Sequence, residues 1–262
     1  MPLEYALKLI MRGEKWKQNI SFLLVCPREA GNIGASARAL KNFGFSRLEL
    51  VAPKKFPSEE ALWFAHGALD VLEKIKIHDS LQNALSGKAL VAGTSRRTGK
   101  QRGPVLTLKE GVKKLKSHAA HGRPVSILFG SEDRGLSNGQ TEECAFLMNI
   151  PAGPEMPSFN LSQAVLLVAY ELFLAETVEE DEGGERKKGG RAKKLATHDE
   201  LRFFHERLRE TLDLLHYIPR GNKDMEITIL KNLKNILSRA EITRWELKML
   251  HGIVSQARTR LE

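Results

Sequence analysis

Short apolar runs alternate with amphipathic stretches between Ile20 and Ala175. The runs are rich in β-branched residues and apolar throughout, which is typical of strands covered on both faces of a parallel sheet. The stretches between them carry apolar residues at helical spacing. This alternation predicts an α/β layer fold with a mostly parallel sheet. The predicted strands are 20–26, 48–52, 89–92, 125–129 and 145–150, and the predicted helices are 33–43, 58–66, 81–85, 108–118 and 161–175.

The pattern changes near residue 178. Residues 179–194 show no apolar period, because a run of acidic residues is followed by glycines and a run of basic residues. Such a segment cannot bury enough surface to offset chain entropy, which predicts a flexible linker. Three helical patterns follow it, and Thr197 with Glu200 and Thr243 with Glu246 have capping-box spacing. The predicted domains are an N-terminal extension (1–18), an α/β domain (19–177), the linker (178–195) and a small all-α domain (196–262).

The charge balance favours a polyanionic partner. The chain has 262 residues, of which 42% are hydrophobic, so it can bury a substantial core. Its 41 Lys and Arg against 32 Asp and Glu give a formal net charge of +9. Nucleic acid is the partner this charge favours, although charge alone does not separate RNA from DNA or from an acidic membrane.

Neither a metal site nor a membrane segment is expected. Cys26 and Cys144 lie far apart without the spacing of a zinc site or a disulfide framework, so we expect buried reduced thiols. The isolated histidines form no recognisable dyad. The first residues lack the apolar core of a signal peptide, and no segment reaches the roughly 20 apolar residues needed to cross a bilayer. The predicted compartment is the cytoplasm.

A first candidate site segment follows the strand that ends at Cys26. Gly31-Asn32-Ile33-Gly34 leads into a helix, and loops at the carboxyl ends of strands bind ligands in α/β sheets. The glycines permit close backbone approach, and Asn32 is suited to cap the helix or to hold a substrate group. Arg38 is expected over the same crevice. The alternative is an ordinary turn with an exposed arginine.

A second segment, Phe129-Gly130-Ser131-Glu132, ends another apolar strand in a turn of small residues with a carboxylate. Glu132 is placed to accept a hydrogen bond from a ligand or to orient Arg38, since charge-assisted pairs are strong when shielded from water. The alternative is a solvated loop acid, and that interpretation also covers Asp133 and Arg134.

A third segment begins with three prolines in residues 151–157, which predict a stiff loop after the strand ending at Ile150. Ser158, Asn160 and Ser162 follow at the start of a long apolar helix. Taken singly, such side chains are most often helix caps.

A basic loop follows the strand that ends near Ala92. Four cations lie on this glycine-containing segment, where they can contact phosphates; the alternative is a solvated loop. The predicted RNA-binding residues are Arg96, Arg97, Lys100 and Arg102.

The first three segments, which contain Asn32, Glu132 and Asn160, together resemble the motifs of the SpoU branch of the SPOUT methyltransferases, over roughly residues 19–175. The resemblance implies a deep trefoil knot in the α/β domain, an S-adenosylmethionine cofactor bound there, and a homodimer that completes the cleft. The cofactor contacts implied are Thr94, Ser95, Gly130, Ile150, Ser158 and Leu161. The residues implied at the methylated ribose, the catalytic set, are Asn32, Arg38, Glu132, Ser158 and Asn160.

The implied reaction is in-line transfer of a methyl group to a ribose 2′-hydroxyl, which needs alignment and removal of one proton but no metal. The resemblance gives the role of base to Arg38. A guanidinium holds its proton too tightly to act alone, so two versions stay open. Arg38 either acts as a base assisted by an RNA phosphate, or clamps the phosphate and ribose.

The helical tail is similar to the C-terminal extension of TrmJ-type tRNA methyltransferases, which implies methylation of nucleotide 32 in the tRNA anticodon loop. Two alternatives stay open: a ribosomal RNA 2′-O-methyltransferase of the same fold, and a non-catalytic RNA-binding protein. A dinucleotide-binding oxidoreductase is disfavoured, because no Gly-x-Gly-x-x-Gly follows a strand with the required acidic partner.

Overall fold

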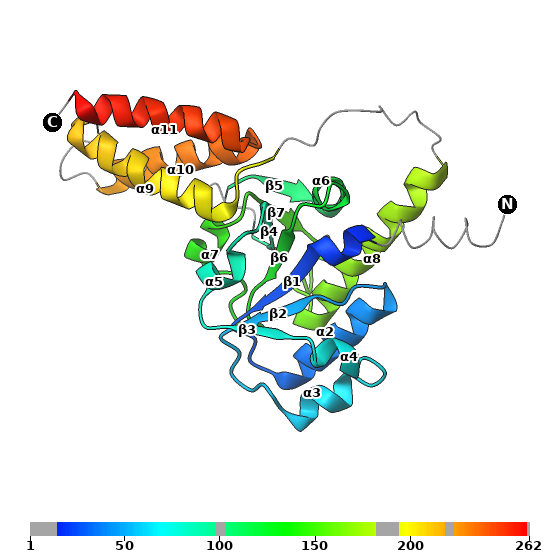
Figure 1. The fold of residues 1–262 in the computed structure, drawn as a ribbon. Coiled ribbons are helices and arrows are strands. Elements are labelled where there is room, and N and C mark those ends of the chain that lie inside the picture. The colour runs from blue at the N-terminus through cyan, green and yellow to red at the C-terminus, as the bar shows by residue number, and fades with distance from the viewer. Residues whose placement is uncertain (1–14, 98–102, 182–193, 218–222, 261–262) are drawn as a thin grey trace. The chain divides into compact units, whose positions relative to one another are not determined.

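A computed structural model describes residues 15–97, 103–181, 194–217 and 223–260 (Figure 1). The chain divides into two compact units, Met1–Arg186 and Lys187–Glu262. The first unit contains a seven-stranded sheet of order β3-β2-β1-β6-β4-β7-β5, and each of its six strand pairs is parallel. The strands are β1 (Ile20–Val25), β2 (Leu48–Val51), β3 (Lys76–His78), β4 (Leu90–Thr94), β5 (Val105–Thr107), β6 (Val125–Phe129) and β7 (Phe146–Asn149).

Helices follow most of these strands, as a parallel sheet requires. A short 3-10 helix, η1 (Lys15–Asn19), precedes β1. The helices of the first unit are α2 (Ala30–Asn42), α3 (Glu59–Phe64), α4 (Leu69–Leu72), α5 (Leu81–Leu85), α6 (Leu108–Ala120), α7 (Asn138–Glu142) and α8 (Leu161–Asp181).

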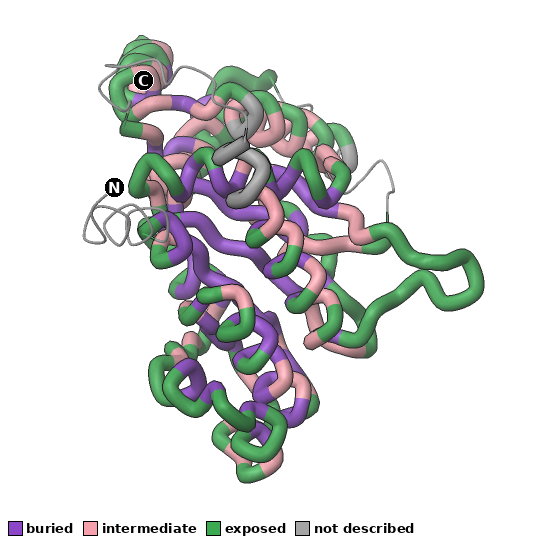
Figure 2. The backbone as a smooth tube through the Cα atoms, turned by 90° about the vertical axis from the view of Figure 1, so that its right-hand side faces the viewer, coloured by how far each residue is buried: buried purple, intermediate pink, exposed green. Residues whose placement is uncertain are grey.

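The two faces of the sheet are covered unequally. The larger core joins one face to α2, α6 and α8, and includes Phe22, Ile127 and Val165. The other face packs Leu23 and Leu128 against α5 and the segment around Leu136. Figure 2 shows the buried strands inside and the exposed positions on the outer turns of the helices. Strands covered on both faces explain why their sequences are apolar throughout.

The predicted α/β class and mostly parallel sheet are confirmed. All five predicted strands and all five predicted helices are present. The helix at 81–85 has the predicted bounds, and the other four have shifted ends; α8 continues to Asp181, beyond the predicted start of the linker. Strands β3 and β5 and helices α4 and α7 were not predicted. Both missed strands have three residues and little buried surface, so they leave no apolar run. The trefoil knot stays a prediction.

The second unit consists of three helices, α9 (His198–Leu214), α10 (Lys223–Arg239) and α11 (Arg244–Thr259). Both predicted capping boxes are present, at Thr197 with Glu200 and at Thr243 with Glu246. A small core that includes Phe204 and Leu247 holds the helices together. The small all-α part of the predicted fold is therefore confirmed. Most of the predicted linker, residues 182–193, lies outside the described residues.

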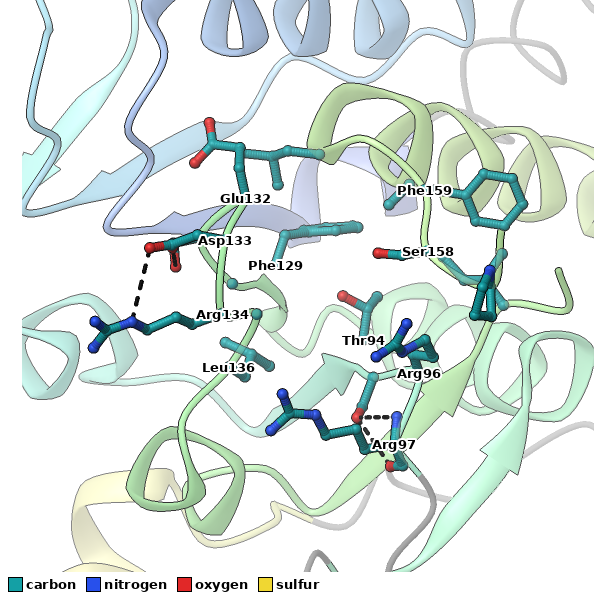
Figure 3. Close-up of a pocket in the computed structure, with 18 residues that line it drawn as sticks. Thr94, Arg96, Arg97, Phe129, Glu132, Asp133, Arg134, Leu136, Ser158 and Phe159 are labelled. Atoms are coloured by element: carbon teal, nitrogen blue, oxygen red, sulfur yellow. Dashed lines mark hydrogen bonds and ion pairs between the residues drawn. The ribbon is translucent and has the colours of Figure 1, made fainter. Parts of the chain in front are cut away.

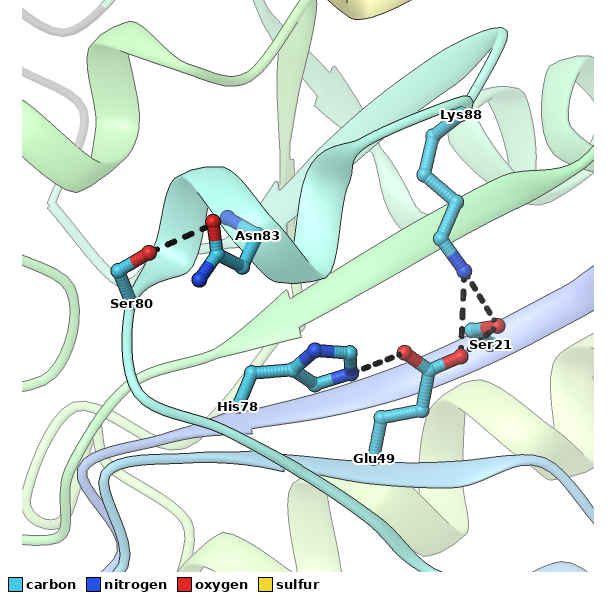
Figure 4. A network of polar contacts seen from close by, with 6 residues as sticks. All are labelled: Ser21, Glu49, His78, Ser80, Asn83 and Lys88. Atoms are coloured by element: carbon cyan, nitrogen blue, oxygen red, sulfur yellow. Dashed lines mark hydrogen bonds and ion pairs between the residues drawn. The ribbon is translucent and has the colours of Figure 1, made fainter.

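A buried polar network lies on the α5 face of the sheet (Figure 4). The Glu49 carboxylate accepts hydrogen bonds from Ser21 (2.6 Å) and Lys88 (3.1 Å) and lies 2.9 Å from Nε2 of His78. Burial raises the pKa of Glu49, but these hydrogen bonds and the Lys88 charge outweigh it and hold the pKa below its ordinary value. The network joins residues of β1, β2 and β3, and none of its residues lines the pocket described below.

In the described ranges, no helix is long and apolar enough to cross a membrane, and no group of three or more His, Cys, Asp or Glu could hold a metal ion. Cys26 and Cys144 are half-buried free thiols.

Candidate functional site

The loops after three neighbouring strands form one pocket, and the loop after a fourth, β1, lies beside them. In the sheet order, β1, β6, β4 and β7 are adjacent and parallel, so the loops that follow them meet at one edge. The loops after β6, β4 and β7, with the start of α8, enclose a pocket of about 280 Å³ (Figure 3). This volume is near the lower end of the roughly 300–1,000 Å³ of small-molecule sites. All six predicted cofactor residues line it: Thr94, Ser95, Gly130, Ile150, Ser158 and Leu161.

Glu132 connects the β6 loop to the start of α2. Its Oε2 accepts a hydrogen bond from the backbone N–H of Arg28 (2.9 Å). Its Oε1 accepts from the backbone N–H of Glu29 (3.2 Å) and from Nδ2 of Asn32 (2.9 Å). The carboxylate therefore satisfies backbone donors at a helix start whose own N-cap side chain makes no capping bond.

These hydrogen bonds keep Glu132 ionised. Burial raises the pKa of Glu132, but the hydrogen bonds from Asn32 and from the backbone N–H groups of Arg28 and Glu29 outweigh it, and the pKa lies below its ordinary value. A carboxylate that stays charged holds Asn32 in one orientation at neutral pH.

The β6 loop is tightly folded. A Cβ on Gly130 would overlap the backbone of Gly135 and Leu136, so only glycine fits there. The N–H of Gly135 donates to the carbonyl of Ser131 (2.8 Å), and Gly135 itself has a φ of +66°. Within this turn, Asp133 forms an ion pair with Arg28 and accepts a hydrogen bond from Ser131 (2.9 Å). The loop therefore presents fixed groups to the pocket.

The β7 loop, residues 150–160, contains no helix or strand, as its prolines predict. Asn160 caps α8, because its Oδ1 accepts hydrogen bonds from the backbone N–H (2.9 Å) and the hydroxyl (2.8 Å) of Ser162. Ser158 and Phe159 lie in the pocket wall, whereas Asn160 is exposed and is not among the lining residues.

The β4 loop is held by its neighbours. The Thr94 hydroxyl donates to the carbonyl of Leu128 (3.1 Å), and the backbone N–H of Ser95 donates to the carbonyl of Met148 (3.0 Å). Arg96 and Arg97, two of the predicted RNA-binding residues, line the pocket, and their contact with RNA stays a prediction. The other two, Lys100 and Arg102, lie outside the described residues.

The structure brings only some of the predicted catalytic residues to the pocket. Asn32, Glu132 and Ser158 lie at or beside the pocket, but the capping interpretation of Asn32 is wrong. Helix α2 begins at Ala30, so Asn32 lies inside it, and its side chain donates to Glu132. Arg38 is exposed further along α2 and does not line the pocket.

Some lining residues were not predicted from the sequence. The pocket wall also contains Phe129, Phe159, Arg134 and Leu136. Each of these residues lies in or directly beside a segment that the sequence analysis had singled out. Treating every residue of those segments as a candidate would have included them.

A family model described as the SpoU rRNA Methylase family matches residues 19–170, and the chain belongs to this family. Two similar proteins are named TrmJ. The tRNA (cytidine/uridine/adenosine-2′-O-)-methyltransferase TrmJ of Pseudomonas aeruginosa is 32% identical over 241 residues, which are 90% of this chain and 93% of that protein. The tRNA (cytidine/uridine-2′-O-)-methyltransferase TrmJ of Citrobacter koseri is 35% identical over 240 residues, 91% of this chain and 96% of that protein.

A crystal structure of TrmJ from Z. mobilis ZM4 has a similar fold. It superposes with a TM-score of 0.75 at 30% sequence identity, and the match covers 91% of this chain and 98% of that chain. The resemblance to TrmJ-type proteins therefore extends to the C-terminal helices.

Proposed function

We propose that this chain is an S-adenosylmethionine-dependent tRNA methyltransferase that modifies the ribose 2′-hydroxyl of nucleotide 32 in the anticodon loop. One observation carries the proposal: all six predicted cofactor residues line a single pocket beside Glu132, in a chain of the SpoU methylase family. The names of the TrmJ relatives support tRNA as the substrate and the ribose oxygen as the acceptor. The choice of nucleotide 32 rests on the resemblance of the helical tail.

The pocket suits an adenosine-containing methyl donor. Phe129, Leu136 and Leu161 give it an apolar wall for an adenine ring, while Thr94 and Ser158 bring hydroxyl groups to it. S-adenosylmethionine supplies an electrophilic methyl group, so the transfer itself requires no metal. The mainly small side chains along these loops leave backbone groups to make many of the polar contacts.

The chain's own residues align the acceptor and remove its proton. As the ribose oxygen bonds to the methyl carbon and the carbon–sulfur bond breaks, the hydroxyl proton has to leave. Asn32, held by Glu132, is placed to position the ribose, and Ser158 lies in the wall of the same pocket. Arg38 assists proton removal together with an RNA phosphate or clamps that phosphate. Asn160 orders the start of α8 and so supports Ser158.

Arg38 reaches the site in this proposal through a homodimer. An α-helix turns about 100° and rises about 1.5 Å per residue, so Arg38 lies about 9 Å along α2 from Asn32 and about 120° around it. It therefore faces away from the pocket of its own chain. In the dimer, it serves the pocket of the partner subunit.

An apolar strip on α8 supports this dimer. Leu166, Tyr170 and Phe173 are spaced along one side of the helix and exposed. Phe43, which follows α2 as its C-cap, packs against the two rings. A surface of this kind on the helix layer that carries Arg38 suits a second copy of the same chain.

The proposed substrate also implies a cytoplasmic enzyme.

The test is to incubate the protein with methyl-labelled S-adenosylmethionine and unmodified tRNA transcripts, and to map the label by nuclease digestion and mass spectrometry. We expect a 2′-O-methyl group at nucleotide 32 and no transfer to a transcript with 2′-deoxyribose at that position. Ribosomal RNA serves as the competing substrate. Label on ribosomal RNA alone, or RNA binding without any methyl transfer, would overturn the proposal.

A further inference from the structure

Three arginines, Arg96, Arg97 and Arg134, line the pocket. Figure 3 shows Arg96 and Arg97 near Thr94, and Arg134 beside Asp133 with its guanidinium at the outer end of the side chain. Arg96 and Arg97 are both exposed. The pocket therefore has a cationic side.

The two acidic residues of the pocket, Glu132 and Asp133, make their hydrogen bonds with groups other than the three arginines. Glu132 accepts its hydrogen bonds from the start of α2. Asp133 pairs with Arg28 and accepts a hydrogen bond from Ser131, and its pKa is lowered first by that Ser131 hydrogen bond. Asp133 also lies 3.7 Å from Nε of Arg134. With three arginines against two carboxylates, the lining of the pocket carries an excess of positive charge.

Arg134 is highly exposed and has only a loose ion pair. Its side chain is 89% exposed, and its Nε lies 3.7 Å from Asp133, beyond hydrogen-bonding distance. A guanidinium has five N–H donors in a planar fork, so most of those on Arg134 are available to a ligand.

The backbone beneath Arg134 is fixed although its side chain is exposed. The residue lies between Asp133, which pairs with Arg28, and Gly135, whose N–H bonds to Ser131 across the turn. The close approach of Gly130 to Gly135 leaves this turn no room to shift. A cation on a rigid turn at the mouth of a pocket loses little conformational freedom when it binds an anion.

We propose that Arg134 is a positioning residue that binds a backbone phosphate of the RNA next to the methylated ribose, with Arg97 as its neighbour on the same side. The inference rests on the proposed function, since it places the RNA strand across the cationic side of the pocket. Arginine suits this role because its fork binds two phosphate oxygens at once. Such a contact orients the ribose without reading the base.

The test compares Arg134→Ala and Arg134→Lys with Arg123→Ala in the full-length protein. Arg123 precedes β6, whereas Arg134 follows it, so the control removes the same group at the opposite end of one strand. The tRNA affinity is measured at several salt concentrations, and S-adenosylmethionine binding is measured by calorimetry. Methyl transfer is followed at varied tRNA concentration.

We expect Arg134→Ala to weaken tRNA binding about tenfold at low salt and to reduce the salt slope by about one. The effect falls mainly on KM for tRNA. Arg134→Lys restores most of the salt slope but only part of the affinity, because it keeps the charge and loses the fork. Affinity for S-adenosylmethionine is unchanged in all variants, and Arg123→Ala behaves as wild type in the salt slope.

Two results would overturn the inference. In one, Arg134→Ala weakens S-adenosylmethionine binding and leaves the tRNA salt slope intact, which assigns the residue to the cofactor. In the other, Arg134→Ala matches Arg123→Ala in every measurement, which gives it no role. If wild-type protein transfers no methyl group to tRNA, the proposed function fails, and that result is separate from either outcome.

Discussion

Replacing Glu132 by glutamine tests how the β6 loop is joined to the start of α2. The glutamine keeps one oxygen and places an amide nitrogen where the other was. With its oxygen at the Oε1 position, it still accepts from Glu29 and Asn32, but it loses the bond from the Arg28 N–H. The amide N–H groups then face that backbone donor.

The cost follows from these three bonds. A hydrogen bond to a charged acceptor contributes about 1.5–3 kcal/mol and one to a neutral acceptor about 0.5–1.5 kcal/mol. Losing one bond and weakening two costs about 3–5 kcal/mol in a shielded site. Glu132 is only half-buried, so water replaces part of this, and we expect about 1–2 kcal/mol and a fall in Tm of about 2–8 °C.

The loss also reaches the chemistry, because Asn32 is no longer held by a charge. We expect kcat/KM to fall by about 10- to 100-fold, which corresponds to about 1.4–2.8 kcal/mol. Urea denaturation gives the stability, and hydrogen exchange of a peptide spanning residues 26–32 reports the freed backbone amides directly. Glu142→Gln, at an exposed position on α7, is the matched control.

The stability difference depends on pH with a definite sign. Because the pKa of Glu132 is lowered in the folded chain, its stabilisation is complete above its unfolded value near 4.5 and is lost as the pH falls through the folded value. Wild type and Glu132→Gln should therefore converge below pH 4.5. Equal stability at pH 7, with unchanged exchange over residues 26–32, would refute the reasoning.

Three further substitutions have defined outcomes. Gly130→Ala should destabilise the α/β unit by about 1–3 kcal/mol and abolish S-adenosylmethionine binding in calorimetry, whereas Gly139→Ala, which has open space around it, should do neither. Lys88→Met leaves Glu49 buried without its cation and should lower the free energy of unfolding by about 3–5 kcal/mol, while kcat at permissive temperature stays near wild type. Arg38→Ala and Gly130→Ala chains should each be inactive alone. A dimer that contains one chain of each variant should regain methyl transfer, because it has one intact pocket served by one intact Arg38, and no recovery would contradict a shared site.

The sequence predicted the elements whose stability comes from a continuous apolar run. Strands β1 and β6 are buried along their whole length, so the pattern located them within a residue or two. Strand β3 has two exposed residues out of three and forms only by pairing with β2, which is a long-range contact. No local pattern reports such a strand.

In the site, too, local sequence motifs were readable and long-range contacts were not. The motifs named Glu132 and Asn32 as site candidates, and the structure joins the two by a hydrogen bond at the edge of the pocket. Their relationship was not readable from the sequence. Asn32 has the character of a helix cap, but Glu132, 100 positions away, accepts the N–H groups of Arg28 and Glu29, so the helix begins before Asn32. A contact over that separation exists only once β1 and β6 are paired.

A crystal structure of the protein with S-adenosylhomocysteine, the product of methyl transfer from the proposed donor, tests the central claim most directly. The account predicts the adenosine against Phe129 and Leu161, between the loops that follow β4, β6 and β7, with Glu132 still bonded to Asn32. Density for the ligand at any other place on the chain, or no bound ligand at saturating concentration, would contradict it.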